Sequence, residues 1–236
     1  MKKTLYAAVI AVILGVISVA MLNRSSYTSK CIDYRCQQIK IPLYLKLLDF
    51  FNRHLNYLNL TMGIVDGVTQ DQEKVMRIFC WTVDNIRKVP PGMPIVDDHV
   101  WYTIIRGYGA DDQASDVFTT LCNYAGLQAF YEYTYAQKGM PGVPLSFVRI
   151  GGEWFVFDPY RGIIFVDGNN KLISLDAIKD GAYWQTSGNR QDTDHPDYGI
   201  YFTHLRRIKN TGLHHSSIQS PLNRLIFQIK KARQGS

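Results

Sequence analysis

The chain has 236 residues, a formal net charge of +6 and a pI of about 9.1. Apolar residues make up 46%, as in an ordinary globular protein with room for one domain and extensions. The basic residues are dispersed, with a local concentration only in "KKARQ" near the C-terminus. No basic helix carries base-reading side chains, so nucleic acid is excluded as the expected partner. Internal repeats and low-complexity segments are absent from the sequence.

Residues 1–23 form an anchoring or targeting segment. Lys2 and Lys3 precede an uncharged, mainly apolar run from Leu5 to Leu22. As a helix this run would be about 27 Å long, close to the thickness of a hydrocarbon core. A signal peptide usually has a shorter apolar region, although Ser18-Val19-Ala20 would serve as a cleavage site. The length favours an uncleaved transmembrane anchor, and a cleaved signal is the alternative.

The charges and cysteines beside this run bear on its orientation. The two lysines before it favour a cytoplasmic N-terminus, whereas Arg24, Lys30 and Arg35 on the other side weaken that preference. Cys31 and Cys36 could form a disulfide if the backbone turns between them, which needs an oxidising compartment. Two unpaired thiols are the alternative. We expect a single-pass membrane protein whose soluble domain is periplasmic or otherwise extracytoplasmic.

Residues 24–66 are expected to be a polar linker followed by an amphipathic helix. The stretch from Asn23 to Lys40 is polar. In the following "IPLYLKLLDFFNRHLNYLNL", Pro42 suits a first helical turn and apolar residues recur at helical spacing. By default this helix packs on the main domain; lying along a bilayer surface is the alternative.

Residues 67–216 are expected to form the main domain, which begins with two helices of clear 3.6-residue periodicity. In the first, Thr69 and Gln72 match a capping box, Pro90-Pro91 ends the helix and Cys80 is assigned to the core. The second begins near Asp111. Its apolar stripe includes Phe118, Leu121 and Cys122, and Gly126 is placed just beyond its end.

Short β-rich runs follow these helices, namely "LQAFYEYTYA", "PLSFVRI", "EWFVFDPY" and "GIIFVDG". Gly151-Gly152 predicts a hairpin turn between the second and third. The order predicts an α+β domain with a short antiparallel sheet. Residues 217–236 predict a basic amphipathic helix, which is either an ordinary terminal helix or one suited to an anionic surface.

Several motifs together resemble the transglutaminase-like fold, a branch of the papain-like superfamily, over about Gln70 to Asp167. These motifs are "WTVDNI" at 81–86, "GADDQA" at 109–114, "AGL" at 125–127, "GEW" at 152–154 and "DP" at 158–159. The Asp-Gln pair within "GADDQA" is similar to bacterial members found in polysaccharide clusters. The resemblance implies a catalytic triad of cysteine at a helix N-terminus, histidine on the next strand and aspartate on the strand after it.

In this sequence two of the three triad positions carry other residues. Asp111 stands where the family has its cysteine, Val143 stands at the histidine position and Asp158 keeps the orienting aspartate. A thiolate needs a base, and a carboxylate that orients a base has no catalytic role without one. We therefore expect Asp111 to be a structural N-cap and Cys122, on an apolar stripe, to be buried and inert.

The resemblance and the anchor together imply a catalytically inactive transglutaminase-like protein at the membrane. It would be an accessory or scaffold subunit of cell-envelope machinery, with polysaccharide synthesis or export as the process. The alternatives are a hydrolase with a displaced nucleophile, acting on peptidoglycan or glycan esters, and a glycan- or peptide-binding module. Candidate binding residues for the module are the strand aromatics Tyr131, Tyr133, Trp154 and Tyr160.

No cofactor or metal is expected. The Cys-x4-Cys pair lacks a second ligand pair at zinc-site spacing, and His214-His215 is more readily a solvated pair. A base could still be supplied by a histidine of the loop-rich tail, such as His195 or His204, if it crossed the cleft.

Overall fold

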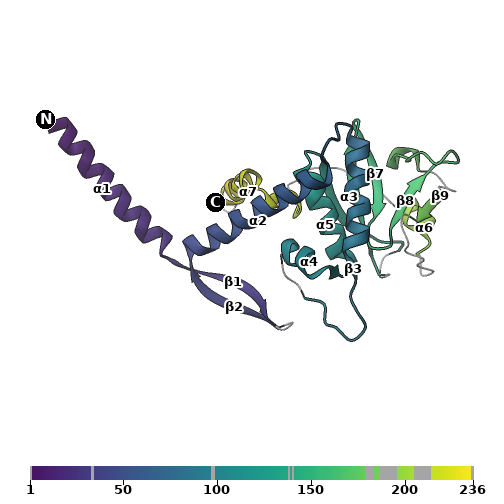
Figure 1. Cartoon of the computed structure of the whole chain (residues 1–236), viewed down its shortest axis with the longest axis horizontal. Coiled ribbons are helices and arrows are strands. Elements are labelled where there is room, and N and C mark those ends of the chain that lie inside the picture. Colours follow the sequence, from purple (N-terminus) through teal and green to yellow (C-terminus); the bar gives the residue numbers. More distant parts are fainter. Residues whose placement is uncertain are drawn as a thin grey trace. The chain divides into compact units, whose positions relative to one another are not determined.

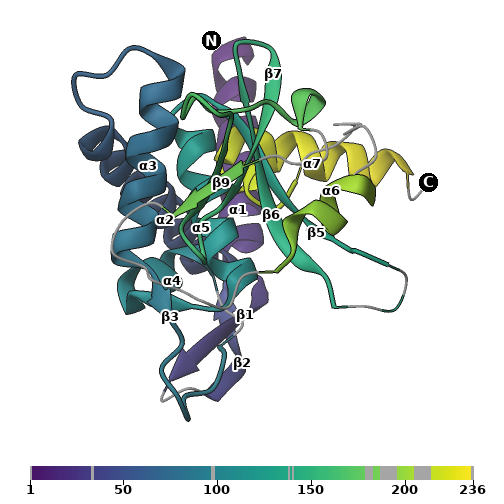
Figure 2. The ribbon, with the colours of Figure 1, turned by 90° about the vertical axis from the view of Figure 1, so that its right-hand side faces the viewer.

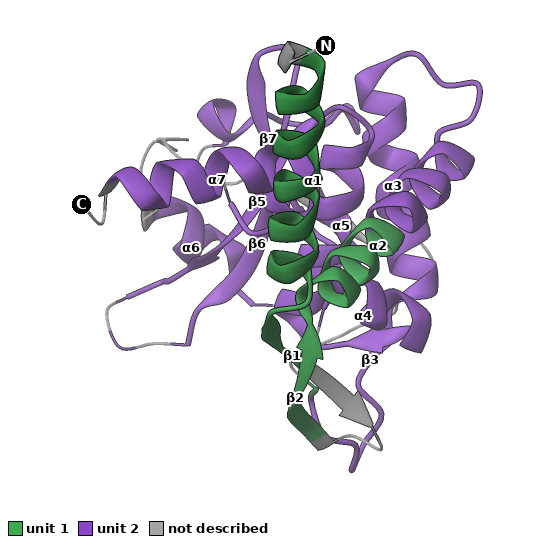
Figure 3. Cartoon of the chain, turned by 90° about the vertical axis from the view of Figure 1, so that its left-hand side faces the viewer, with its two compact units in different colours: residues 1–53, 96–98 green, residues 54–95, 99–236 purple. Residues whose placement is uncertain are grey.

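The computed structural model describes residues 2–32, 35–96, 99–137, 139, 141–178, 183–186, 196–204 and 214–234. The chain divides into two compact units (Figures 1 and 3). Unit 1 comprises residues 1–53 and 96–98, and unit 2 comprises residues 54–95 and 99–236.

Unit 1 begins with the apolar helix α1, Lys2–Leu22. Its described side chains are exposed throughout, as expected for a helix whose apolar surface has no protein core to cover it. From Thr4 to Leu22 it is long and apolar enough to cross a membrane, a property that anchors and signal sequences share.

Residues 25–42, expected to be a polar linker, instead form an antiparallel hairpin of β1, Ser25–Ile32, and β2, Arg35–Pro42. The β-branched and aromatic residues scattered among its polar ones favour extended backbone. Cys31 is opposite Cys36 in the register, and Cys36 is disulfide-bonded. The Cys31 side chain lies outside the described part of the chain. Lys46 Nζ donates to the carbonyl of Tyr27 at 2.7 Å and so ties the next helix to the hairpin.

That helix, α2, runs from Leu43 to Ile64 and is shared between the units. In its first half the large apolar side chains of Leu45, Leu48 and Phe51 are exposed. In its second half Tyr57 is fully buried, with its ring edge-on to Trp101. The second half of α2, which belongs to unit 2, therefore packs on the main domain as expected.

Unit 2 contains a five-stranded antiparallel sheet whose order, β5-β6-β7-β8-β9, follows the chain. Helices α3, Asp71–Asn85, and α5, Asp111–Tyr124, pack against it (Figure 2). The strands are β5, Gln128–Thr134; β6, Val143–Ile150; β7, Glu153–Asp158; β8, Ile163–Val166; and β9, Tyr183–Thr186. The predicted α+β class and its short antiparallel sheet are confirmed.

Shorter elements complete unit 2. Helix α4 is Val100–Arg106, and the two-residue strands β3, Arg87–Lys88, and β4, Tyr108–Gly109, pair in parallel. Beyond the sheet are α6, Tyr198–His204, and the terminal helix α7, Pro221–Gln234. Two single turns of 3-10 helix are η1, Leu175–Ala177, and η2, Ser217–Gln219.

Two apolar clusters form the core, because alternate residues of each strand point to opposite faces. One lies between the sheet and helices α3 and α5, where the rings of Phe79, Phe118 and Phe157 contact one another. The other includes Phe130 and Phe165 and is covered by Tyr198 of α6. Full burial of a phenylalanine contributes about 1.5–3 kcal/mol, so these clusters dominate the stability of the unit.

Some predictions of local structure are confirmed and others are wrong. Gly126, Gly151 and Gly152 have φ of 85°, 59° and 97°, which confirms the predicted helix end and hairpin turn. The predicted capping box is wrong, because α3 begins at Asp71 and its N-cap, Gln70, makes no side-chain cap bond. Cys80, assigned to the core, is exposed, because it lies on the side of α3 opposite the buried stripe.

Candidate functional site: the N-terminus of α5

The start of α5 is fixed by the chain just before it. β4 pairs with β3, and a Cβ added to Gly109 would come within 3.0 Å of side-chain atoms of Gln113 and Thr103. Ala110 is the N-cap and has no acceptor, while Gln113 Oε1 accepts a hydrogen bond from the Ala110 N–H at 3.1 Å. The expectation that Asp111 is the N-cap is therefore wrong, because Asp111 is the first helical residue.

Asp111 stands where the resemblance places the nucleophile. Its Oδ1 accepts a hydrogen bond from the Asp112 N–H at 2.9 Å. Burial raises the pKa of Asp111, and the neighbouring Asp112 and Asp158 carboxylates raise it further, against the lowering effects of that hydrogen bond and of Arg161. The site therefore has an acidic side chain whose charge is disfavoured, at the point where a cysteine would become a thiolate.

Asp158 is fully buried and its carboxylate is completely engaged. Arg161 Nη1 donates to Asp158 Oδ2 at 2.9 Å, and the Arg161 backbone N–H donates to Oδ1 at 3.1 Å. The Tyr198 hydroxyl donates to Oδ2 at 2.8 Å. The sequence suggested an orienting carboxylate with nothing to orient, whereas the structure gives it a guanidinium and a phenol as partners.

The Asp158 carboxylate raises the pKa of both side chains that bond it, Arg161 and Tyr198. Burial alone would lower the pKa of Arg161, but the Asp158 carboxylate outweighs it and the net effect is to raise that pKa. Burial, reinforced by the Asp158 charge, raises the pKa of Tyr198. Tyr198 thus stays a neutral donor and Arg161 a cation at neutral pH. Arg161 neutralises the Asp158 charge, and the donors from both residues occupy the carboxylate oxygens that would otherwise orient an imidazole.

Val143, at the histidine position, is part of the apolar core. It is buried in the second cluster, which also contains Leu145, Val156 and Tyr198. A valine has neither a proton acceptor nor a donor. The apolar cluster therefore extends to the tyrosine that bonds Asp158.

Among the described residues, the other candidate reactive groups do not complete a triad. Cys122 is fully buried, and burial raises its pKa well above the ordinary value, so its thiol is unreactive, as predicted. The imidazole of His99 lies beside the Tyr102 ring. His195 and the side chain of His204 lie outside the described residues.

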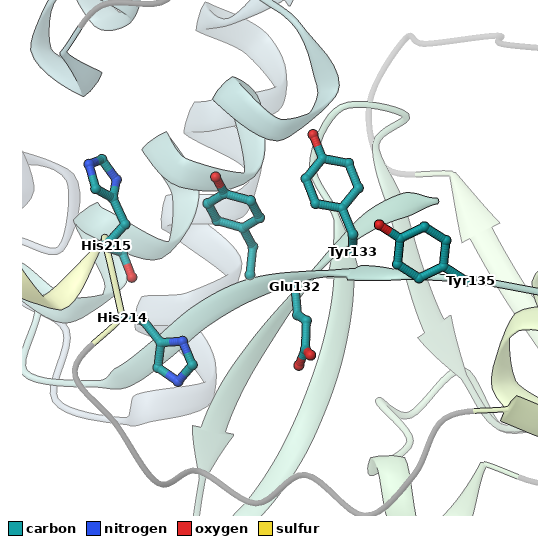
Figure 4. Close-up of a pocket in the computed structure, with 7 residues that line it drawn as sticks. Glu132, Tyr133, Tyr135, His214 and His215 are labelled. Atoms are coloured by element: carbon teal, nitrogen blue, oxygen red, sulfur yellow. The ribbon is translucent and has the colours of Figure 1, made fainter. Parts of the chain in front are cut away.

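A pocket of about 430 Å³ lies along β5, the edge strand of the sheet (Figure 4). Tyr133 and Tyr135 point to one side of the strand, and Glu132 and His214 point to the other. The Tyr133 hydroxyl donates to Asp112, and burial together with the Asp112 charge raises the pKa of Tyr133 to about 12. The pocket is lined by Tyr131, Glu132, Tyr133, Tyr135, His214, His215 and Ser216.

Residues 214–216 form one wall of this pocket and contact both α5 and β5. His215 Nδ1 is 2.6 Å from Asp116 Oδ2, and Ser216 Oγ donates to the Ala129 carbonyl at 3.1 Å. The His214 ring stacks on Phe130 with centroids 4.1 Å apart, and burial lowers the pKa of His214. The expectation that both histidines are solvated holds for His215, which is exposed, and is wrong for His214, because nothing local showed that the tail returns to the sheet.

Of the four predicted binding aromatics, Tyr131 and Tyr133 line the pocket, with ring centroids 6.5 Å apart. Trp154 packs edge-on against Phe130. Tyr160 lies between two cations, with Lys88 Nζ 5.1 Å and the Arg161 guanidinium 5.5 Å from its centroid. Because alternate residues of a strand face the same side, the sequence could have predicted Tyr135 as a third tyrosine beside Tyr131 and Tyr133.

Within the part of the chain that the structure describes, no three metal-ligating side chains lie together. The arrangement at α5 raises the pKa of Asp111, donates hydrogen bonds from tyrosines and presents aromatic surface. It supplies no imidazole beside the N-terminus of α5 among the described residues.

The sequence of residues 59–159 matches the family model for the transglutaminase-like superfamily. This part of the chain is therefore similar to that superfamily, and the match ends next to Asp158. No curated protein matched the chain in sequence.

Two solved structures are similar. One is a candidate cysteine protease from Cytophaga hutchinsonii, at 19% identity and a TM-score of 0.38 over 60% of this chain and 53% of that one. The other is a candidate protease from Parabacteroides distasonis, at 12% identity and a TM-score of 0.38 over 56% and 35%. The chain thus spans about half of the first and a third of the second.

Proposed function

We propose that this protein is a catalytically inactive transglutaminase-like protein, held in the membrane by α1 and acting as an accessory or scaffold subunit of cell-envelope machinery. The observation that carries the proposal is the buried Asp158–Arg161–Tyr198 contact, beside Asp111 and Val143 at the other two triad positions. Three substitutions would be needed before a thiol could be activated, because the base is absent and the orienting group is already bound.

Two further observations support the location and the process. A disulfide at Cys36 fits an oxidising, extracytoplasmic compartment for the segment that follows α1. The Asp112-Gln113 variant of the motif resembles members found in polysaccharide clusters, so polysaccharide synthesis or export is the process we assign. This assignment rests on the resemblance and is open to direct test.

The inactivity is tested by turnover on peptide, amide and ester substrates with the full chain in detergent. We expect no turnover above background for the wild type or for Asp111→Cys, since the introduced thiol has no base. Asp111→Cys with Val143→His still leaves Asp158 bound, so we expect turnover only when Arg161→Met is added as well. Wild-type turnover that disappears in Asp111→Ala but survives in Asp84→Ala, an exposed acid on α3, would refute the proposal.

The scaffold role is tested by purifying the full chain from membranes and identifying what accompanies it. We expect integral or envelope proteins of a polysaccharide pathway in stoichiometric amounts. Isolation of the chain alone, at native expression and in mild detergent, would argue against a scaffold.

The pocket favours a second candidate function, in which the domain binds a glycan or an extended peptide. Tyr133 and Tyr135 lie on one side of an edge strand and line the pocket with Tyr131, and their rings and hydroxyls suit the stacking and hydrogen bonding of a sugar ring. Titration of the full chain with envelope glycans should give a saturable heat. We expect Tyr133→Ala to weaken binding about tenfold, an effect of about 1.4 kcal/mol, whereas Tyr27→Ala in the hairpin should leave it unchanged.

A further inference from the structure

The terminal helix α7 starts from a fixed point on unit 2. Asn223 Nδ2 donates to the Ser217 carbonyl at 3.1 Å, and η2 is joined to α5 through Tyr124 Oη and the Gln219 carbonyl at 3.1 Å. The first turn of α7 is therefore held by the domain. Beyond this turn, the stability of α7 depends on the contacts that the rest of its surface makes.

An apolar stripe on α7 is left exposed. Leu222, Leu225, Ile226 and Ile229 recur at i, i+3, i+4 and i+7 and so share one face of the helix. Leu222 and Leu225 are 68% and 58% exposed. An ordinary terminal helix turns such a stripe into the core, and this one does not. The stripe is an uncovered apolar face that needs an occupant.

The charge of the surrounding sequence indicates what covers this apolar face. Residues 198–236 contain no Asp or Glu. The cations on α7 itself are Arg224, Lys230, Lys231 and Arg233. An apolar stripe on a helix whose charges are all positive is complementary to an anionic lipid surface, where the apolar face enters the acyl boundary and the cations meet phosphates. A protein core would not require this one-signed charge.

We propose that α7 lies in the interface of an anionic membrane, as a second membrane contact of a chain already tethered by α1. The inference rests on the anchoring included in the proposed function. Tethering matters because it makes the second contact intramolecular, so a helix of modest affinity is bound for most of the time. Each lysine or arginine near such a surface is worth about fivefold in binding.

The test is hydrogen exchange on the full chain reconstituted in vesicles of phosphatidylcholine alone or with phosphatidylglycerol. Flotation with the vesicles first establishes that α1 has inserted, so failure of anchoring is seen separately. We expect peptides from α7 to exchange at least fivefold more slowly in the anionic vesicles, with the protection lost at high salt. Peptides from α3 should not change, which also verifies folding.

Variants separate the contributions. Lys230→Gln should reduce the lipid-dependent protection about fivefold, whereas Lys171→Gln, an equal charge loss on an exposed turn far along the sequence, should not. Leu225→Asp should abolish the protection. The proposal is overturned if α7 exchanges equally in both vesicles while the chain floats. It is equally overturned if α7 is protected in neutral detergent with a dimeric mass, since a second copy would then cover the stripe.

Discussion

Removing the guanidinium that engages Asp158 should destabilise the domain strongly. In Arg161→Met the side chain keeps an apolar stem but loses the guanidinium, so among the described residues the buried carboxylate keeps the Tyr198 hydroxyl and one backbone N–H as donors. Breaking a buried ion pair from one side costs about 3–5 kcal/mol. Because the Arg161 side chain keeps 16% of its surface exposed, we expect the lower end, about 3 kcal/mol.

The assay is thermal and urea unfolding of the full chain in detergent, followed by tryptophan fluorescence. A loss of about 3 kcal/mol corresponds to a fall in Tm of about 6–12 °C for a domain of this size. Arg149→Met is the matched control, because Arg149 is an exposed arginine that bonds the Gly152 carbonyl, and its loss should cost less than about 0.5 kcal/mol.

A compensating variant sharpens the reasoning. Asp158→Asn combined with Arg161→Met removes the buried charge as well as its partner, so the double variant should be more stable than Arg161→Met alone. If Arg161→Met unfolds within about 0.5 kcal/mol of the wild type, the contact does not hold the site. The argument that Asp158 is unavailable for catalysis would then fall with it.

Three further outcomes are expected. Folding raises the pKa of Asp111, so the folded chain keeps this proton to higher pH than the unfolded chain, and the wild type loses stability as pH rises above 3.8, the ordinary pKa of the group. Between about pH 3 and pH 7 the urea midpoint of Asp111→Asn should therefore rise relative to that of the wild type. A fall would contradict the burial argument. Iodoacetamide at about pH 8 should alkylate Cys80 in the native chain and Cys122 only after unfolding, as read by mass spectrometry, and native labelling of Cys122 would show that the core opens. His215→Ala should cost about 1 kcal/mol and speed tryptic cleavage within α7, because Asp116 loses its partner, whereas an unchanged cleavage rate would show that this pair does not fix the tail.

The sequence predicted the elements whose signals are local. The stripes of α3 and α5 and the paired glycines of the β6–β7 turn are encoded within a few residues, and the structure has them. Motif spacing predicted that Asp111 and Asp158 stand at two of the triad positions. The exact role of Asp111 could not be predicted, because one residue decides whether a side chain caps a helix or begins it.

What the sequence did not predict depends on contacts between distant residues. Tyr198 reaches Asp158 across forty positions, and His215 reaches Asp116 across ninety-nine. Neither tyrosine nor histidine lies in a motif, and no periodicity in the tail indicates that it returns to the domain. The hairpin after α1 was missed for another reason, since its strands are largely polar and their alternation is weak.

Because the tail returns to the domain, some contacts of the domain can form only after the end of the chain has been synthesised. Residues 215, 216 and 219 supply partners for side chains or backbone at 116, 129 and 124, so the bonds close loops of 99, 87 and 95 residues. Such loops close late and with an entropic cost. By the time residue 219 leaves the ribosome, α1 has long been available for membrane insertion. Until residue 219 has been synthesised, β5 lacks part of its cover, and its exposed edge is where a chaperone or a neighbouring strand could bind the nascent chain.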